Sequence, residues 1–226
     1  LVVRNDGSDR MGFAYRKGTS VMTTHMLMPK DASFTEIDGL KIRMVRSASQ
    51  DGVPILMTAP WPESIYAFNV LWPRICGIGP VTAVDLPGFG MSESRPDLMS
   101  PEAMGRFLIR TMDEVGIERA HVIAPDVGTL AALFAASSNP ERFESIVGGS
   151  GGISMDLLGE PLRQIVESSQ DDFAGSDGGE QVYQLVKTMA RTTIPEIILE
   201  DYRASSKGQR WNEVADFVRA YPRDLP

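Results

Sequence analysis

Cysteine and long apolar runs are scarce in this 226-residue chain, and each scarcity argues against a class of protein. The single cysteine, Cys76, cannot form an internal disulfide, which argues against a disulfide-stapled secreted scaffold and favours a reducing cytoplasm. No apolar run approaches the roughly 18 residues that a membrane-spanning helix needs. The first residues also lack the basic, apolar and small-residue order of a secretory signal. We therefore expect a cytoplasmic protein that makes no membrane contact.

Positive charge is in deficit as well: 22 lysines and arginines face 30 aspartates and glutamates, which gives a net charge of -8. Such a charge opposes sequence-independent binding to nucleic acid or to an anionic membrane. The sequence shows no metal-ligand cluster, and its glycine-rich stretch 148–152 lacks the lysine that follows a phosphate-binding loop. We expect a small-molecule substrate, neither a metal nor another cofactor, and either a monomer or a homodimer.

The composition is that of a globular chain, with 42 % apolar and 23 % charged residues, and the pattern divides it into three parts. Residues 1–32 are polar and aperiodic, which predicts an arm or extension without a functional role. Residues 33–152 alternate short apolar runs with helical patterns, which predicts a doubly wound, mainly parallel α/β sheet. Residues 153–226 are helix-like around an acidic, glycine-rich break at 171–179, which predicts a helical cap over that sheet.

The spacing of apolar residues, together with the turn and cap residues between them, predicts the strands and helices of the sheet layer. Alternation of apolar and polar residues about an Asp-Gly turn predicts a hairpin, short apolar runs predict buried strands, and an N-terminal cap with proline in the first turn predicts a helix. These patterns place the hairpin at 34–45, strands at 53–57, 81–84, 120–124 and 146–147, and helices at 101–115 and 128–138.

Three stretches that leave expected strands carry the chemistry. Residues 58–64 read Thr-Ala-Pro-Trp-Pro-Glu-Ser, residues 85–92 read Asp-Leu-Pro-Gly-Phe-Gly-Met-Ser, and residues 124–128 read Ala-Pro-Asp-Val-Gly. The second and third stretches resemble the α/β-hydrolase family, in which a nucleophile lies on a tight turn between a strand and a helix. The Trp-Pro-Glu-Ser run resembles the segment after the oxyanion His-Gly of epoxide hydrolases and haloalkane dehalogenases.

The resemblance implies that Asp126 is the nucleophile. On such a turn the side chain projects from the strand end near the helix N-terminus, where free N–H groups stabilise negative charge. The small residues Ala124 and Gly128 suit the crowded neighbouring positions. An aspartate nucleophile attacks an sp³ carbon that bears a leaving group and forms an ester, which water then hydrolyses. The alternative is an ordinary helix N-cap, because aspartate is a favoured cap.

By the family pattern, the oxyanion donors are the backbone amides of Trp61 and Val127. The chain departs from the pattern at two points. Ala59-Pro60 replaces the family's His-Gly, and Pro60 has no N–H to donate. Val127 replaces a tryptophan whose indole helps to hold the halide in dehalogenases, which favours an epoxide over a haloalkane as substrate.

Cap phenols donate to the epoxide oxygen in epoxide hydrolases, and three tyrosines occur in the expected cap. Tyr221 resembles the tyrosine at the end of that family's cap and is the candidate acid. Tyr183, Tyr202 and Trp211 are expected to pack within the cap.

The largest departure from the family pattern concerns the general base. The family uses a histidine for the water that hydrolyses the ester, but only His25 and His121 occur here. His25 falls in the arm, and His121 opens the strand that leads to Asp126, at the end remote from the turn. Gly148-Gly149-Ser150-Gly151, where some dehalogenases carry the triad acid, has no carboxylate. We expect the histidine and the acid beyond Pro226, so that the chain carries only the N-terminal part of the hydrolase core.

Three functions remain open from the sequence. The first is an epoxide hydrolase-like enzyme that acts on a small apolar substrate, and the second is a haloalkane dehalogenase with an unusual halide site. The third is a degenerate hydrolase-fold protein that binds a ligand without turnover, which the Ala59-Pro60 pair and the histidine gap favour. A serine-type esterase is disfavoured because the turn carries Asp126.

Overall fold

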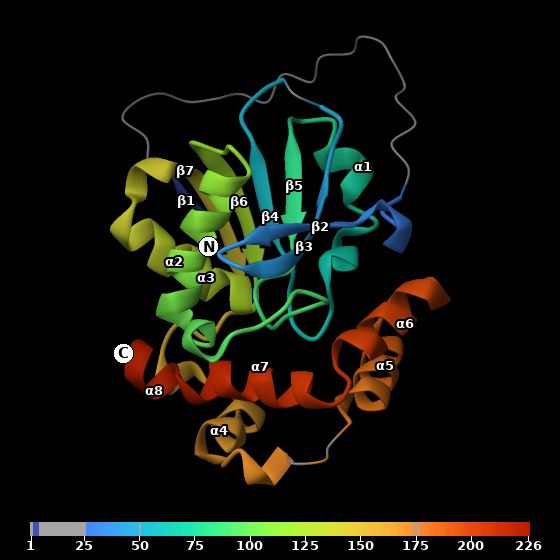
Figure 1. Ribbon diagram of the computed structural model, residues 1–226, viewed down its shortest axis with the longest axis vertical. Coiled ribbons are helices and arrows are strands. Elements are labelled where there is room, and N and C mark those ends of the chain that lie inside the picture. Colours follow the sequence, from blue (N-terminus) through green and yellow to red (C-terminus); the bar gives the residue numbers. More distant parts are fainter. Residues whose placement is uncertain (1, 5–25, 50, 174, 176) are drawn as a thin grey trace.

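The computed structural model describes residues 2–4, 26–49, 51–173, 175 and 177–226, and its centre is a single seven-stranded sheet (Figure 1). The strand order is β1-β7-β6-β4-β5-β3-β2. Neighbours are parallel from β7 to β5, while β1, β3 and β2 run antiparallel to the strands beside them. This arrangement confirms the expected mainly parallel α/β sheet. The strands are β1 (Val2–Arg4), β2 (Ser33–Ile37), β3 (Leu40–Arg46), β4 (Ile55–Thr58), β5 (Val81–Val84), β6 (Ala120–Pro125) and β7 (Phe143–Gly149).

Helices cover the sheet and gather at one end of it, where the C-terminal part of the chain lies (Figure 1). The α-helices are α1 (Trp72–Ile75), α2 (Pro101–Glu114), α3 (Val127–Ser138), α4 (Glu160–Glu167), α5 (Gly178–Met189), α6 (Glu196–Ser205), α7 (Gln209–Arg219) and α8 (Tyr221–Asp224). Short 3₁₀ helices are η1 (Pro29–Asp31), η2 (Ile65–Phe68), η3 (Pro96–Leu98), η4 (Pro140–Arg142), η5 (Met155–Leu157) and η6 (Asp171–Phe173). Among the helices described, none is long and apolar enough to cross a membrane.

Local sequence signals account for the elements that position the site. Ile37 pairs with Leu40 across the Asp38-Gly39 turn, which confirms the hairpin, and both turn residues have positive φ. The helix expected at 101–115 forms over Pro101–Glu114, and the Ser100 hydroxyl accepts from an amide in its first turn. Strands β4 and β5 are buried along their whole length, as expected for strands covered on both faces.

Two apolar clusters form the core, and helices of the predicted cap contribute to both. Phe217 and Tyr221 from α7 and α8 belong to the cluster that contains α2 and α3. Ile198 and Tyr202 from α6 belong to the cluster that contains Trp72 of α1. The cap is therefore packed against the sheet layer through shared apolar contacts. The division of the chain at residue 152 stays a prediction.

The described ends of the N-terminal segment contact the rest of the molecule. Val2–Arg4 pairs antiparallel with β7, and Leu27 is buried in a core cluster. Residues 5–25, which include His25, lie outside the described residues. The absence of a function for residues 1–32 stays a prediction.

Candidate active site

A strained turn places Asp126 between strand β6 and helix α3. β6 ends at Pro125 and α3 begins at Val127, while Asp126 has φ 53° and ψ -123°. An ordinary N-cap has extended backbone and accepts from the amide of the second or third helical residue. Asp126 has neither that backbone nor a capping bond. Such strain costs of order 1–3 kcal/mol and occurs mainly at functional sites. The structure therefore contradicts the ordinary N-cap and shows the elbow geometry that exposes a side chain at a strand end.

Close packing and three hydrogen bonds hold the elbow in this shape. A Cβ at Gly128 would collide with the Thr58 hydroxyl, so only glycine fits there. The Thr129 hydroxyl donates to the Ala124 carbonyl at 2.7 Å, and to the Gly149 carbonyl at 3.2 Å. The amide of Asp126 donates to the same Gly149 carbonyl at 2.7 Å. These contacts over-determine the turn, and the expectation of small neighbours around the aspartate is confirmed.

Two backbone amides converge on the Asp126 carboxylate. The Trp61 amide donates to Oδ2 at 2.9 Å, and the Val127 amide also bonds to the carboxylate. Burial raises the pKa of Asp126, while the two amide bonds act in the opposite direction. Within the part of the chain that the structure describes, Asp126 has no ion-pair partner. The two amides expected from the sequence thus meet at one carboxylate, which has no cation beside it among the described residues.

The segment after β4 brings Trp61 to the elbow and to the cap at once. Its buried start, Ala59, follows the strand, and the Trp61-Pro62 peptide is cis. The Trp61 amide faces Asp126, while its ring lies 5.3 Å from the ring of Trp211 on α7, measured between centroids. Trp211 therefore packs, as expected, but against the sheet layer as well as within the cap.

The structure brings Tyr221 close to Asp126. Burial raises the pKa of the Tyr221 hydroxyl, and the charge of Asp126 raises it further. The Tyr221 ring packs edge-on against Phe217, at 5.7 Å between centroids. Tyr183 does not join this group, because its hydroxyl donates to Glu196 at 2.6 Å. The charge of Asp126 therefore reaches the Tyr221 hydroxyl, whereas the Tyr183 hydroxyl is bonded to Glu196.

Glu63 is a site residue that sequence reasoning missed. Burial raises the pKa of Glu63, and the charge of Asp126 raises it further. The charge of Glu63 in turn contributes to the raised pKa of the buried phenol of Tyr202. The available signal was its position two residues after Trp61, in a loop at the carboxyl end of a strand.

His121, the histidine among the described residues, does not lie at the elbow. His121 stands at the start of β6, where it pairs with Ile55, and its Nδ1 lies 2.8 Å from the Ser145 hydroxyl. It is structural, as expected, while His25 lies outside the described residues. No group of three or more His, Cys, Asp and Glu side chains that could hold a metal ion is found among the residues described.

Comparison with known proteins places this geometry in a family. A family model described as the alpha/beta hydrolase fold matches residues 80–194, which include both the 85–92 loop and the elbow. The chain belongs to this family. The resemblance drawn from the motifs is confirmed by this match.

Individual relatives of the hydrolase include both enzyme types expected from the motifs. A haloalkane dehalogenase from Psychrobacter cryohalolentis is 25% identical over 208 residues, which cover 89% of this chain and 65% of that protein. The juvenile hormone epoxide hydrolase of Manduca sexta is 31% identical over 122 residues, which cover 48% of this chain and 26% of that protein. The chain thus spans less than two thirds of the length of either relative.

Solved structures share the fold. The crystal structure of wild-type Cfl2 from Burkholderia cenocepacia superposes with a TM-score of 0.75 at 21% identity, and covers 85% of this chain and 71% of that one. Because the identity is low, this likeness establishes the architecture of the hydrolase and not its substrate.

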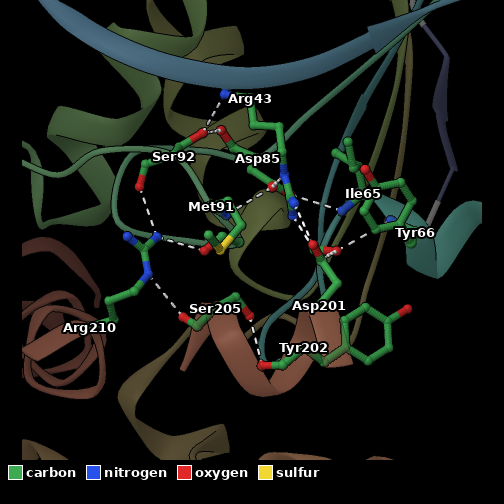
Figure 2. A network of polar contacts seen from close by, with 12 residues as sticks. Arg43, Ile65, Tyr66, Asp85, Met91, Ser92, Asp201, Tyr202, Ser205 and Arg210 are labelled. Carbon is green, nitrogen blue, oxygen red and sulfur yellow. Dashed lines mark hydrogen bonds and ion pairs between the residues drawn. The ribbon is translucent and has the colours of Figure 1, made fainter. Parts of the chain in front are cut away.

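The hydrolase also contains a buried ion network that the motifs did not reveal (Figure 2). Arg43 of β3 lies between Asp85, which opens the 85–92 loop, and Asp201 of α6. The amides of Ile65 and Met91 also donate to Asp85. Arg43 and Asp201 stand 158 positions apart, so no local pattern could have joined them.

Proposed function

We propose that this hydrolase forms a covalent ester at Asp126 by attack on an sp³ carbon, in the manner of an epoxide hydrolase that acts on a small apolar substrate. The observation that carries the proposal is the Asp126 carboxylate itself. It stands on a strained elbow, accepts from the Trp61 and Val127 amides, and has no cation beside it among the described residues. A carboxylate held only by amides is fixed in place yet keeps its negative charge for attack.

In the first half-reaction one carbon–oxygen bond forms and another breaks. One oxygen of Asp126 bonds to a ring carbon of the epoxide, and the bond from that carbon to the ring oxygen breaks. The released alkoxide takes the hydroxyl proton of Tyr221, which the structure brings close to Asp126. In the second half-reaction water adds to the carbonyl carbon of the ester while a general base takes its proton, and the Trp61 and Val127 amides stabilise the tetrahedral oxyanion. The oxyanion then collapses, the bond from the Asp126 carbon to the diol oxygen breaks, and that oxygen takes a proton, which releases the diol and restores the Asp126 carboxylate. Only this second step needs a general base.

The first half-reaction therefore gives a direct test on the chain as it stands. We expect styrene oxide to add its mass to the peptide that contains Asp126, as measured by mass spectrometry after digestion. The Asp126→Asn variant is the matched control and should remain unmodified at that peptide. An unmodified Asp126 in the wild-type chain after prolonged incubation would contradict the proposal and favour a ligand-binding protein of the same fold.

The second candidate is a haloalkane dehalogenase, which the relative that covers 89% of the chain favours. The same residue would then displace a halide in place of an epoxide oxygen. Val127 offers no indole donor to a departing halide, so we expect 1-bromohexane to label Asp126 at least ten times more slowly than styrene oxide. Equal or faster labelling by the bromoalkane would reverse the order of the two candidates.

A further inference from the structure

The Arg43 side chain joins the cap to the sheet layer. Its Nε donates to Asp85 Oδ2 at 2.6 Å, while Nη1 and Nη2 donate to the two oxygens of Asp201 at 2.6 and 3.0 Å. The Arg43 side chain is 5% exposed and that of Asp201 is 11% exposed. A two-pronged guanidinium–carboxylate contact fixes direction as well as distance. Helix α6 is thereby seated on β3 in one orientation.

The same two carboxylates hold consecutive residues of the segment after β4. The Ser64 hydroxyl donates to Asp201 Oδ2 at 2.7 Å, and the Ile65 amide donates to Asp85 Oδ1 at 2.8 Å. Figure 2 shows both carboxylates turned toward Arg43 from opposite sides, with Ile65 beside them. One end of the segment is thus bound to the cap and to the sheet layer through a single guanidinium.

The other end of that segment is the oxyanion donor. Trp61 lies three residues before Ser64, and its amide donates to Asp126 at 2.9 Å. Residues 61–64 therefore link Asp126 to Asp201 of helix α6. Trp61 at one end is hydrogen-bonded to Asp126, and Ser64 at the other end is hydrogen-bonded to Asp201. The Trp61 amide cannot move far from Asp126 while Ser64 remains bound to Asp201.

A second cation from the cap is hydrogen-bonded to the 85–92 loop, which carries Asp85. Arg210 of α7 donates to the carbonyls of Gly90 and Ser92 at 2.6 and 2.8 Å. The Ser92 hydroxyl in turn donates to the Asp85 carbonyl at 2.6 Å. The loop that carries Asp85 is therefore bound to α7 while Asp85 and Asp201 are bound through Arg43.

We propose that Asp201 is a positioning residue, which holds residues 61–64 through Ser64 so that the Trp61 amide faces Asp126. Seating of helix α6 and formation of the oxyanion site are then one event. The kinetic consequence rests on the proposed ester chemistry at Asp126, whereas the structural consequence does not. The competing explanation is an ion pair that stabilises the fold and leaves the Trp61 amide independent of the cap.

The Ser64→Ala variant separates these explanations, because it removes the link to Asp201 and leaves the Arg43 ion pairs intact. We expect the maximal rate of Asp126 labelling by styrene oxide to fall roughly 10-fold to 100-fold, because the Trp61 amide donates to Asp126 Oδ2 and orients the attacking carboxylate. The styrene oxide concentration that gives half of that rate should change less than about threefold, because the donor acts on the transition state. Glu200→Gln is the matched control on α6 and should label at the wild-type rate, because the exposed Glu200 pairs with half-buried Arg203 and, among the described residues, is not bonded to Arg43 or Ser64.

Hydrogen exchange supplies a readout that does not depend on catalysis. We expect the amides of Trp61, Glu63 and Ser64 to exchange at least roughly tenfold faster in Ser64→Ala and in Asp201→Asn, while α2 keeps its wild-type protection. If the wild-type chain forms no ester, the proposed function fails but the exchange result still tests the positioning role. Unchanged exchange at 61–64, an equal loss of protection throughout the chain, or faster exchange with an unchanged labelling rate would each overturn the proposal.

Discussion

Two aspartates follow strands of the same parallel sheet, and the structure gives them opposite surroundings. Asp85 follows β5 and is fully buried, while Asp126 follows β6 and is partly buried. Burial raises the pKa of both carboxyl groups. Asp85 is bonded to the Arg43 guanidinium and to two amides, whereas Asp126 is bonded to two amides and, among the described residues, to no cation. The two carboxylates therefore differ in that the Arg43 guanidinium is bonded to Asp85, while no described cation is bonded to Asp126.

Under the proposed function, that difference separates a structural acid, Asp85, from a nucleophile, Asp126. A carboxylate that shares a guanidinium has its charge neutralised and its oxygens directed to fixed donors, so it stabilises the fold and cannot approach a substrate carbon. A carboxylate that accepts only amide bonds is oriented but not neutralised. The sheet thus uses one residue type at two strand ends for two purposes, and the contrast can be tested by substitution.

The largest expected effect is on stability, in the Asp85→Asn variant. The substitution removes one of the two carboxylates that neutralise the buried Arg43 and weakens the acceptor for the Ile65 and Met91 amides, so we expect a loss of about 3 kcal/mol in the free energy of unfolding. Urea denaturation followed by circular dichroism measures it. The control is Asp97→Asn, because Asp97 forms its pair with Arg95 at the exposed surface and should be silent. A loss below about 1 kcal/mol would show that Asp85 and Asp126 do not differ in the way described.

The sequence predicted the sheet layer well because its signals are local. The Asp38-Gly39 turn specifies the β2–β3 hairpin, and Ser100 and Pro101 begin α2 where the capping pattern places them. Short, continuously apolar runs predicted where the central strands lie. They did not predict the length of β7, which extends over Phe143–Gly149, well beyond the two residues expected. Strand length is set by pairing with a neighbour, which a single run of sequence does not contain.

The site was predictable only as far as its motifs reach. The motifs identified Asp126, Trp61 and Val127, and the structure brings all three together. They did not identify Glu63, whose raised pKa depends on burial, or Asp201, whose partner Arg43 lies on another element. Burial and long-range pairing are tertiary properties, so no periodicity reveals them.

The next largest effect is expected from loss of the proton that Tyr221 would donate to the alkoxide released when Asp126 attacks. Tyr221→Phe should slow labelling by styrene oxide roughly 100-fold, because a general acid contributes 10²–10⁴-fold. Labelling by 1-bromohexane should not change, since a halide leaves without a proton. Tyr183→Phe is the control, because the Tyr183 hydroxyl is bonded to Glu196 within the cap. An equal loss with both reagents would show that Tyr221 acts through packing against Phe217 and not as an acid.

A smaller effect tests whether the elbow itself, and not only its carboxylate, separates the two strand ends. In Gly128→Ala the new Cβ would collide with the Thr58 hydroxyl, and we expect a loss of about 1–3 kcal/mol in the free energy of unfolding. The Thr58 hydroxyl is buried and has no hydrogen-bond partner among the described residues, so Thr58→Ala should recover much of that loss. Gly149→Ala, where a Cβ meets nothing within 4 Å, is the matched control. No rescue by Thr58→Ala would contradict the packing explanation.

The smallest effect is the most direct contrast with Asp85, because Asp126→Asn should stabilise the protein. Burial raises the pKa of Asp126 in the folded state, so between its unfolded and folded pKa values the folded chain holds a proton that the unfolded chain has released. Wild-type stability therefore falls as pH rises through that window, and the asparagine variant, which has no such proton, escapes the fall. Asparagine also tolerates the positive φ at this position better than most residues and keeps an acceptor for the Trp61 amide. We expect a gain of up to about 1 kcal/mol that is present at neutral pH and vanishes below the unfolded pKa, measured by urea denaturation at a series of pH values. If Asp126→Asn instead destabilised the chain as Asp85→Asn does, Asp126 would be a second structural acid, and the ester chemistry proposed for it would lose its physical basis.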